Sequence, residues 1–295
     1  MALSVLLKII VDMRKAVAII ILLVLVAAPC FADFKFAVIS DTQASDEDGI
    51  NNGVLTAIMD KIKSEHVDFI MVTGDMVDGS TRTSEHIKQL RKWKVFMDGY
   101  NIPVYCIAGN HIIQSEMSEN IFRVIFEMPE NGLDGLKELV YSFDRGKAHF
   151  AGLDTDEYKS FHKIGEKQFN WLKSDLEKNK NKIIFIFGHD PAYPIKSHIH
   201  SSLDQFPSKR DELWALFKNY NVKAYFCGHE HLYNKSLRDG VYQIIAGGGG
   251  GSLVEKPKKG GFYHFVIVNV KDTGSCEVIV KDINGSVKDA FNIEY

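Results

Sequence analysis

Acidic, amide and imidazole side chains recur in short motifs along the chain, most of them beside a glycine. In chain order the motifs read "SDTQ", "TGDMVDG", "AGNH", "FGHD" and "CGHEH". Their candidate ligand residues are Asp41, Gln43, Asp75, Asn110, His189, His229 and His231. Carboxylate oxygens and imidazole nitrogens suit Zn, Fe or Mn, and asparagine adds a neutral oxygen. Together the motifs predict a metal centre with enough ligands for two adjacent ions.

Each motif taken alone has a simpler explanation. A Gly-Asp or Gly-Asn pair after a strand is usually a turn. The "GHEH" motif is more informative, because alternate residues of an extended segment share a face, so that His229 and His231 point together and Glu230 points away. The occurrence of all five motifs in one chain favours a metal site over five independent turns.

Each motif ends an apolar segment that we expect to be a strand. These segments span residues 34–40, 67–74, 102–110, 182–189 and 222–229. Helical periodicity occurs at 51–66, 83–100, 165–179 and 210–221, and in shorter form at 117–126 and 133–139. Alternating strands and helices predict βαβ units around a parallel sheet, whose strands present their carboxyl ends at one edge. The five motifs would therefore meet in one crevice.

The rest of the chain is richer in strands. Residues 139–155 read as a hairpin that turns at Arg145 and Gly146, and the chain from about residue 241 onward reads as a series of strands. We expect one domain at 33–295 with a β-rich C-terminal part. Cys106, Cys227 and Cys276 have no regular spacing, which predicts buried thiols instead of a disulfide framework.

The order of the motifs resembles that of the calcineurin-like metallophosphoesterases, which include purple acid phosphatases and cyclic-nucleotide phosphodiesterases. The resemblance runs from about Phe34 to Gly251. It implies an α/β fold, a β-sandwich of two mixed sheets flanked by helices in four layers (α/β/β/α). It also implies a hydrolase that uses two divalent metal ions (Mn, Fe, Zn or Mg) to cleave a phosphomonoester or phosphodiester.

The resemblance assigns the candidate ligands to two metal ions. Asp41 and His231 would hold the first ion, with position 43 normally a third ligand, and Asp75 would bridge both ions. The ligands of the second ion would be Asn110, His189 and His229. A metal-bridging hydroxide would attack phosphorus in line. Protonated His111, oriented by the carboxylate of Asp78, would assist the leaving oxygen.

Gln43 departs from the pattern of this family, which usually has a histidine at that position. Its carbonyl oxygen could bind the metal directly or hold a metal-bound water, or the side chain could do neither. A neutral oxygen in place of imidazole would tilt the first site toward Mn or Mg over Zn. A catalytically weak or inactive protein of the cell envelope, which binds a metal or a phosphate ligand, is the alternative function. The pairing of His111 with Asp78 favours the enzyme.

Four further residues are candidates for substrate contact: Tyr193, His198, His200 and Tyr233. The tyrosines follow ligand motifs and could stack on a substrate ring or simply pack, and the histidines belong to a loop that could be only exposed. We expect a small phosphorylated substrate, with a nucleotide derivative as one option. The net charge of −3 gives no indication of general nucleic-acid binding.

The first 32 residues read as a secretory signal peptide. Arg14 and Lys15 precede an apolar run from Ala16 to Ala28, and small residues continue to Ala32. A retained anchor is the alternative, but the run is shorter than the roughly 20 residues of a membrane span. We therefore expect a secreted or periplasmic protein, or otherwise one anchored in the membrane and facing outside the cytoplasm.

Overall fold

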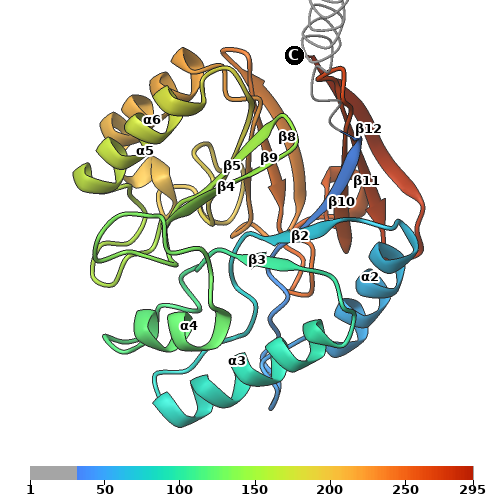
Figure 1. The fold of residues 1–295 in the computed structure, drawn as a ribbon. Helices are drawn as coiled ribbons and strands as arrows, with labels where there is room; N and C mark the ends of the chain where they lie inside the picture. The colour runs from blue at the N-terminus through green and yellow to red at the C-terminus, as the bar shows by residue number, and fades with distance from the viewer. Residues whose placement is uncertain (1–31, 295) are drawn as a thin grey trace, which may run out of the picture. The chain divides into compact units, whose positions relative to one another are not determined.

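Two mixed sheets of six strands each form the centre of the computed structural model, which describes residues 32–294. The strand order is β12-β11-β10-β1-β2-β3 in the first sheet and β4-β5-β6-β7-β9-β8 in the second. Helices cover the outer face of each sheet (Figure 1). The expected four-layer α/β/β/α sandwich is thus confirmed. The predicted signal segment lies outside the described residues, apart from its last residue.

The first sheet combines strands from both ends of the chain. Its strands are β1 (Phe34–Ile39), β2 (Phe69–Val72), β3 (Val104–Cys106), β10 (His264–Val270), β11 (Cys276–Asp282) and β12 (Val287–Ile293). The first three strands are parallel, whereas β10 joins β1 antiparallel. The helices on its outer face are α2 (Asn52–Ser64), α3 (Thr83–Asp98) and α4 (Ser118–Phe126).

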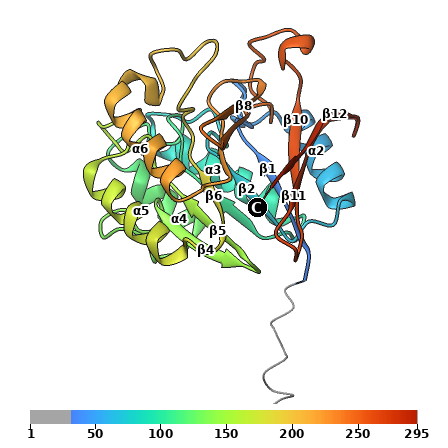
Figure 2. The same ribbon diagram turned by 90° about the horizontal axis from the view of Figure 1, so that it is seen from above.

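The second sheet is built from the middle of the chain. Its strands are β4 (Tyr141–Arg145), β5 (Ala148–Gly152), β6 (Ile183–Phe187), β7 (Ala224–Cys227), β8 (Tyr233–Arg238) and β9 (Val241–Ala246). Strands β5, β6, β7 and β9 run parallel. The covering helices are α5 (Glu166–Asn179) and α6 (Pro207–Asn219). Figure 2 shows these two helices on the opposite side of the molecule from α2.

Alternation along the strands separates the core between the sheets from the cores under the helices. In β1, Phe36 and Val38 pack between the two sheets, whereas Ala37 and Ile39 pack toward the helices of the first sheet. The Phe36 ring meets that of Phe150 at 5.2 Å in an edge-to-face arrangement. Burying apolar faces on both sides of a sheet is what makes these strands apolar at nearly every position.

Two local sequence interpretations differ from the structure. The predicted helix at 133–139 is wrong, because the segment forms turns in which Gly135 and Glu138 have φ values of 92° and 69°. Strand β8 was not predicted, because it is an edge strand with little apolar alternation. The buried state of Cys106, Cys227 and Cys276 is confirmed.

The motif-bearing strands do not belong to one parallel sheet, which corrects the simple βαβ expectation. Strands β1, β2 and β3 lie in the first sheet, and β6 and β7 lie in the second. Their carboxyl ends nevertheless meet, since Asp75 after β2 contacts His189 after β6. Within residues 32–294, no helix is long and apolar enough to cross a membrane.

Candidate metal centre

Unusual backbone conformations place several ligand side chains where their strands end. Asp41, Asp75 and His229 have φ values of 58°, 45° and 68°, in the left-handed region that non-glycine residues seldom adopt. Such strain costs about 1–3 kcal/mol per residue, and it persists only where the surroundings impose it. Position 74 requires a glycine because of close packing: a Cβ there would lie 2.2 Å from His189 Nδ1.

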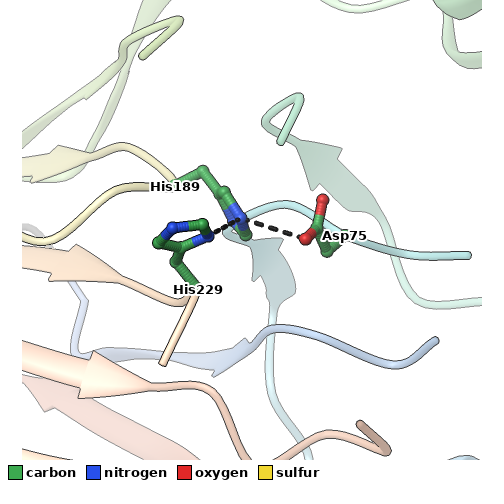
Figure 3. A group of neighbouring side chains, drawn as sticks. All are labelled: Asp75, His189 and His229. Atoms are coloured by element: carbon green, nitrogen blue, oxygen red, sulfur yellow. Dashed lines mark hydrogen bonds and ion pairs between the residues drawn. The ribbon is translucent and has the colours of Figure 1, made fainter. Parts of the chain in front are cut away.

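His189 is at the centre of one group of donor atoms. Its Nε2 lies 3.1 Å from Asp75 Oδ2, 3.1 Å from Asn110 Oδ1 and 3.2 Å from His229 Nδ1. Figure 3 shows the two imidazoles and the carboxylate converging. All but Asn110 are fully or almost fully buried. This group corresponds to the ligands expected for the second metal ion.

The outer contacts of the two imidazoles fix which nitrogen carries the proton. His189 Nδ1 lies 2.9 Å from the carbonyl oxygen of Thr73, and His229 Nε2 lies 2.8 Å from that of Ser201. A carbonyl only accepts, so each of these nitrogens donates and leaves the other with a lone pair. In the neutral rings, two lone pairs therefore face each other at 3.2 Å. A cation is the partner that both can share.

The second donor group is formed by Asp41, Gln43 and His231. His231 Nδ1 lies 3.0 Å from the carbonyl oxygen of Ser252, so that its Nε2 offers a lone pair. That Nε2 lies 3.6 Å from Asp41 Oδ1 and 3.2 Å from Gln43 Nε2. The carboxylate of Asp41 is held in place by the backbone N–H of His229. This group corresponds to the first metal ion.

Gln43 is buried and half satisfied. Its Nε2 donates to Asp75 Oδ2 at 3.4 Å, whereas its Oε1 has no hydrogen-bond partner. A buried amide oxygen without a partner is unfavourable. Turning the amide over would direct this oxygen toward Asp75 Oδ2 and His231 Nε2, where it would join a set of electron-pair donors. The position of Gln43 thus fits a weak oxygen ligand of the first ion.

Asp75 lies between the two donor groups. Its Oδ2 contacts His189 on one side and Gln43 on the other, and its Oδ1 accepts the backbone N–H of His111 at 2.9 Å. One carboxylate oxygen within reach of both groups is the arrangement of a bridging ligand. The donor set, with its facing lone pairs and orphaned amide oxygen, therefore fits two divalent ions.

Electrostatics also favour positive charge in this site. Burial opposes a charge on His189, but the carboxylates of Asp75 and Asp41 outweigh burial and raise the pKa of His189 well above its usual value. Burial would raise the pKa of Asp75, yet His189 lowers it below its usual value. Burial and the neighbouring His189 hold the pKa of His229 well below its usual range. The buried carboxylates are stabilised by nearby positive charge, and bound metal ions would supply it.

His111 is the partly exposed residue beside these ligands. Its Nδ1 lies 2.7 Å from the backbone carbonyl oxygen of Asp78, whereas the carboxylate Oδ1 of Asp78 is 3.7 Å away. The acceptor that orients the ring is therefore the main chain of Asp78, not the carboxylate that we expected. The Nε2 atom is left free, and 35% of the side chain is exposed.

The two loop histidines differ in their surroundings. The ring centroid of His198 lies 3.9 Å from that of the ligand His229. Burial, with repulsion from His231 and His189, lowers the pKa of His198 to about 4. His200 instead has a side chain that is 85% exposed and stands near Asp204.

Both tyrosine candidates have partners in the structure: those of Tyr193 are on β8 and α6, and that of Tyr233 is on β12 of the first sheet. The ring of Tyr193 has Arg238 on it at 3.9 Å and Trp214 edge-on at 5.0 Å. The hydroxyl of Tyr233 donates to Asp289 at 2.7 Å. Their role in substrate contact stays a prediction.

Sequence reasoning missed the role of Glu230, the residue between two histidine ligands. It is fully buried. Its carboxylate accepts backbone N–H groups from Ile195 at 2.8 Å and Lys196 at 2.6 Å. Glu230 thus connects the ligand motif to the loop that bears His198. A buried acid inside the "GHEH" motif was the available signal.

Comparison with known proteins agrees with this geometry. A family model described as calcineurin-like phosphoesterase matches residues 34–233, which is more than half of the chain. The chain belongs to the calcineurin-like phosphoesterase family. Among curated proteins, the chain is similar to acid phosphatase type 7 of Mus musculus, to which it is 30% identical over 162 residues, or 50% of this chain and 36% of that protein.

A bacterial relative and a plant structure extend the comparison. A probable glycerophosphodiester phosphodiesterase of Arcobacter nitrofigilis is 28% identical over 182 residues, covering 61% of this chain and 62% of that protein. The chain thus spans less than two thirds of the length of either curated relative. Purple acid phosphatase PPD1 from yellow lupin (Lupinus luteus) seeds has a TM-score of 0.67 at 17% identity, over 90% of this chain and 54% of that one. This structural likeness shows a shared fold.

Proposed function

We propose that the protein is a phosphoesterase that cleaves a small phosphomonoester or phosphodiester with two divalent metal ions, one on each side of Asp75. The observation that carries the proposal is the position of Asp75 Oδ2, 3.1 Å from His189 Nε2 and 3.4 Å from Gln43 Nε2. Family membership and the phosphatase and phosphodiesterase relatives support the class of reaction.

The residues of the two donor groups would hold the metal ions. The ligands would be Asp41, Gln43 and His231 for the first ion, Asn110, His189 and His229 for the second, and Asp75 for both. When bound, the ions would supply the positive charge that polarises a phosphate group and lowers the pKa of a water molecule. Mn, Fe, Zn and Mg all suit some of these donors, and the amide of Gln43 favours Mn or Mg at the first site.

His111 would assist the departure of the leaving group. Its Nδ1–H donates to the carbonyl oxygen of Asp78, which fixes the ring and leaves Nε2 free to face the substrate. Its backbone N–H meanwhile holds Asp75 Oδ1, so that the imidazole and the bridging carboxylate keep a fixed relation. In its protonated form the ring would give a proton to the leaving oxygen.

His198 is the substrate contact that the geometry supports best among the four candidates. Its ring lies against that of His229, on a loop that Glu230 fixes through the N–H groups of Ile195 and Lys196. Because its pKa is lowered to about 4, His198 is neutral at pH 7. It would therefore bind a substrate through a hydrogen bond or ring contact instead of through charge.

Anomalous diffraction from crystals grown with Mn²⁺ tests the metal assignment. The proposal expects one Mn²⁺ peak at each of the two donor groups, with Asp75 between these two peaks, and loss of both of them or of their relation to residue 75 in Asp75→Asn. A single peak, together with no hydrolysis of p-nitrophenyl phosphate or its bis-ester, would instead favour the binding protein of the cell envelope. The specific observation behind this alternative is Gln43 Oε1, which has no hydrogen-bond partner among the described residues. A neutral amide oxygen at this position would bind the first metal ion only weakly.

We also propose that the mature protein acts outside the cytoplasm. The charged, apolar and small segments of residues 13–32 support this. Sequencing the N-terminus of the protein recovered from the periplasm or medium of an expressing bacterium tests the proposal. A start at Asp33 is expected. Retention of the intact segment in the membrane fraction would instead support the anchored alternative, and recovery of the protein only from the cytoplasm would contradict the proposal.

A further inference from the structure

A second group of chemically active side chains lies behind His229, outside the ligand set described above. It comprises Asp156, Asp190 and His162. The two aspartates are fully buried, and Asp190 directly follows the ligand His189. His162 Nδ1 lies 2.7 Å from Asp190 Oδ2 and 3.6 Å from Asp156 Oδ1. The phosphoesterase chemistry uses none of these three residues.

Within residues 32–294, half of the oxygen atoms of the two carboxylates have no hydrogen-bond partner. Asp156 Oδ2 accepts from the hydroxyl of Thr155 at 2.8 Å, and Asp190 Oδ2 is the oxygen that faces His162. Asp156 Oδ1 and Asp190 Oδ1 are buried and lack a hydrogen-bond partner. Buried polar atoms are satisfied in the large majority of cases, so two orphaned oxygens in one cluster require an explanation.

The cluster also lacks a fixed positive charge. Within residues 32–294, every ion pair of Asp156 or Asp190 is with a histidine. Burying an uncompensated carboxylate is strongly unfavourable, and buried carboxylates are normally paired, protonated or bound to a metal. In line with this, burial raises the pKa of Asp156 to about 8, and the carboxylate of Asp190 adds to the rise.

Pairs of donor atoms in the cluster lie close enough to share one ion. An oxygen of Asp156 and an oxygen of Asp190 lie within 4.8 Å of each other and of a nitrogen of His189. An oxygen of Asp190 also lies within 4.8 Å of nitrogens of His162 and His229. Ligands at about 2.0–2.2 Å from Zn²⁺ lie roughly 3–3.6 Å from one another. The separation of 3.6 Å between His162 Nδ1 and Asp156 Oδ1 agrees with this.

We propose that Asp156, Asp190 and His162 form a third cation site, which takes a divalent transition-metal ion such as Mn²⁺ or Zn²⁺. Coordination would replace the direct hydrogen bond between His162 and Asp190 and occupy the two orphaned oxygens. Two carboxylates and one imidazole form a donor set that suits these metals. The side chain of His162 is 18% exposed, so the cluster is in contact with solvent at this residue.

An ion held by these three residues would steady the residues that would hold the second metal ion. Asp190 Oδ1 lies 3.7 Å from His229 Nε2, and the backbone of Asp190 continues from His189. Fixing the carboxylate of Asp190 would therefore restrain the backbone next to His189. It would also restrain the Nε2 side of the His229 ring. Outer contacts of this kind orient metal ligands and affect metal affinity.

Counting bound metal in the full-length chain tests the proposal. The protein is stripped with a chelator, reloaded with Mn²⁺, passed through gel filtration and measured by plasma mass spectrometry. Wild type is expected to retain one Mn²⁺ more per chain than either Asp156→Asn or His162→Gln. Asp211→Asn, which changes an exposed acid of α6, is the matched control and is expected to equal wild type.

A double substitution separates this site from the centre around Asp75. Asp75→Asn is expected to keep the additional Mn²⁺, and Asp75→Asn combined with Asp156→Asn is expected to lose it. Wild type that retains no more than two Mn²⁺ per chain would overturn the proposal, whether or not the variants fold. Equal metal content in wild type, Asp156→Asn and His162→Gln would overturn it too, and would show that the carboxyl groups share a proton instead.

Discussion

Replacing Glu230 with glutamine is expected to loosen the loop that carries His198 while keeping nearly the same side-chain shape. The carboxylate is fully buried and accepts the N–H groups of Ile195 and Lys196 at 2.8 and 2.6 Å. An amide retains one acceptor oxygen, but its NH₂ group faces the other N–H. The change removes one hydrogen bond to a charged group and leaves a buried donor unpaired, which costs about 2–3 kcal/mol.

Hydrogen exchange measures this loss where it occurs. A decrease of about 2–3 kcal/mol in the free energy of local opening corresponds to roughly 30- to 150-fold faster exchange. We expect this acceleration in the peptide that spans residues 194–202, and no change in a peptide from β11. Mass spectrometry of the metal-stripped protein avoids any contribution from altered metal binding.

Glu255→Gln is the matched control for Glu230→Gln. It makes the same chemical change, and Glu255 pairs with Lys196 of the same loop at 2.5 Å. Lys196 is 48% exposed in this pair. Ion pairs that solvent reaches contribute little to stability, so exchange in the loop is expected to stay close to wild type. If Glu230→Gln behaves like Glu255→Gln, the carboxylate does not hold the loop and the reasoning is refuted.

Three further predictions concern the centre and the stability of the fold. Gln43→His is expected to tighten metal binding at the first site and shift its preference toward Zn²⁺; unchanged metal titrations would make Gln43 a bystander. His111→Ala is expected to lower kcat by roughly 10²- to 10⁴-fold for a poor leaving group, with metal content unchanged; an equal loss with p-nitrophenolate, which needs no proton, would argue against an acid role. Burial would lower the pKa of His149, but the carboxylates of Asp175 and Asp144 outweigh it and raise that pKa. The stability that His149 contributes is therefore complete below about pH 6.5 and lost as pH rises through the raised pKa. Urea unfolding of His149→Gln should show its deficit at pH 6 and a smaller one at pH 9, and a deficit independent of pH would refute this.

The convergence of the candidate ligands could be predicted from the sequence because these residues follow strands. A strand end followed by Asp, Asn or His is visible as an apolar run that stops at a polar residue, as at Asp41 or His189. The family resemblance then assigned these residues to two ions. What the motifs could not show is that β1 to β3 and β6 to β7 belong to different sheets, since each βαβ unit looks the same locally.

Contacts made by the main chain and by buried acids could not be predicted from local sequence patterns. The orientation of His111 depends on the carbonyl oxygen of Asp78, an atom that every residue type possesses. The functions of Glu230 and Asp156 depend on segments more than 30 residues away in sequence. The segment at 133–139 has helical spacing, but the left-handed backbone at Gly135 prevents a helix. These features are decided by tertiary structure.

Metal-dependent hydrolysis by the full-length chain tests the central claim most directly. The protein is stripped of metal, assayed with p-nitrophenyl phosphate and its bis-ester, and assayed again after separate addition of Mn²⁺, Zn²⁺, Fe²⁺ and Mg²⁺. We predict no hydrolysis without metal, restored hydrolysis of at least one substrate with at least one metal, and loss of that activity in Asp75→Asn. Restored metal content without hydrolysis of either ester, or activity that Asp75→Asn retains, would contradict the account.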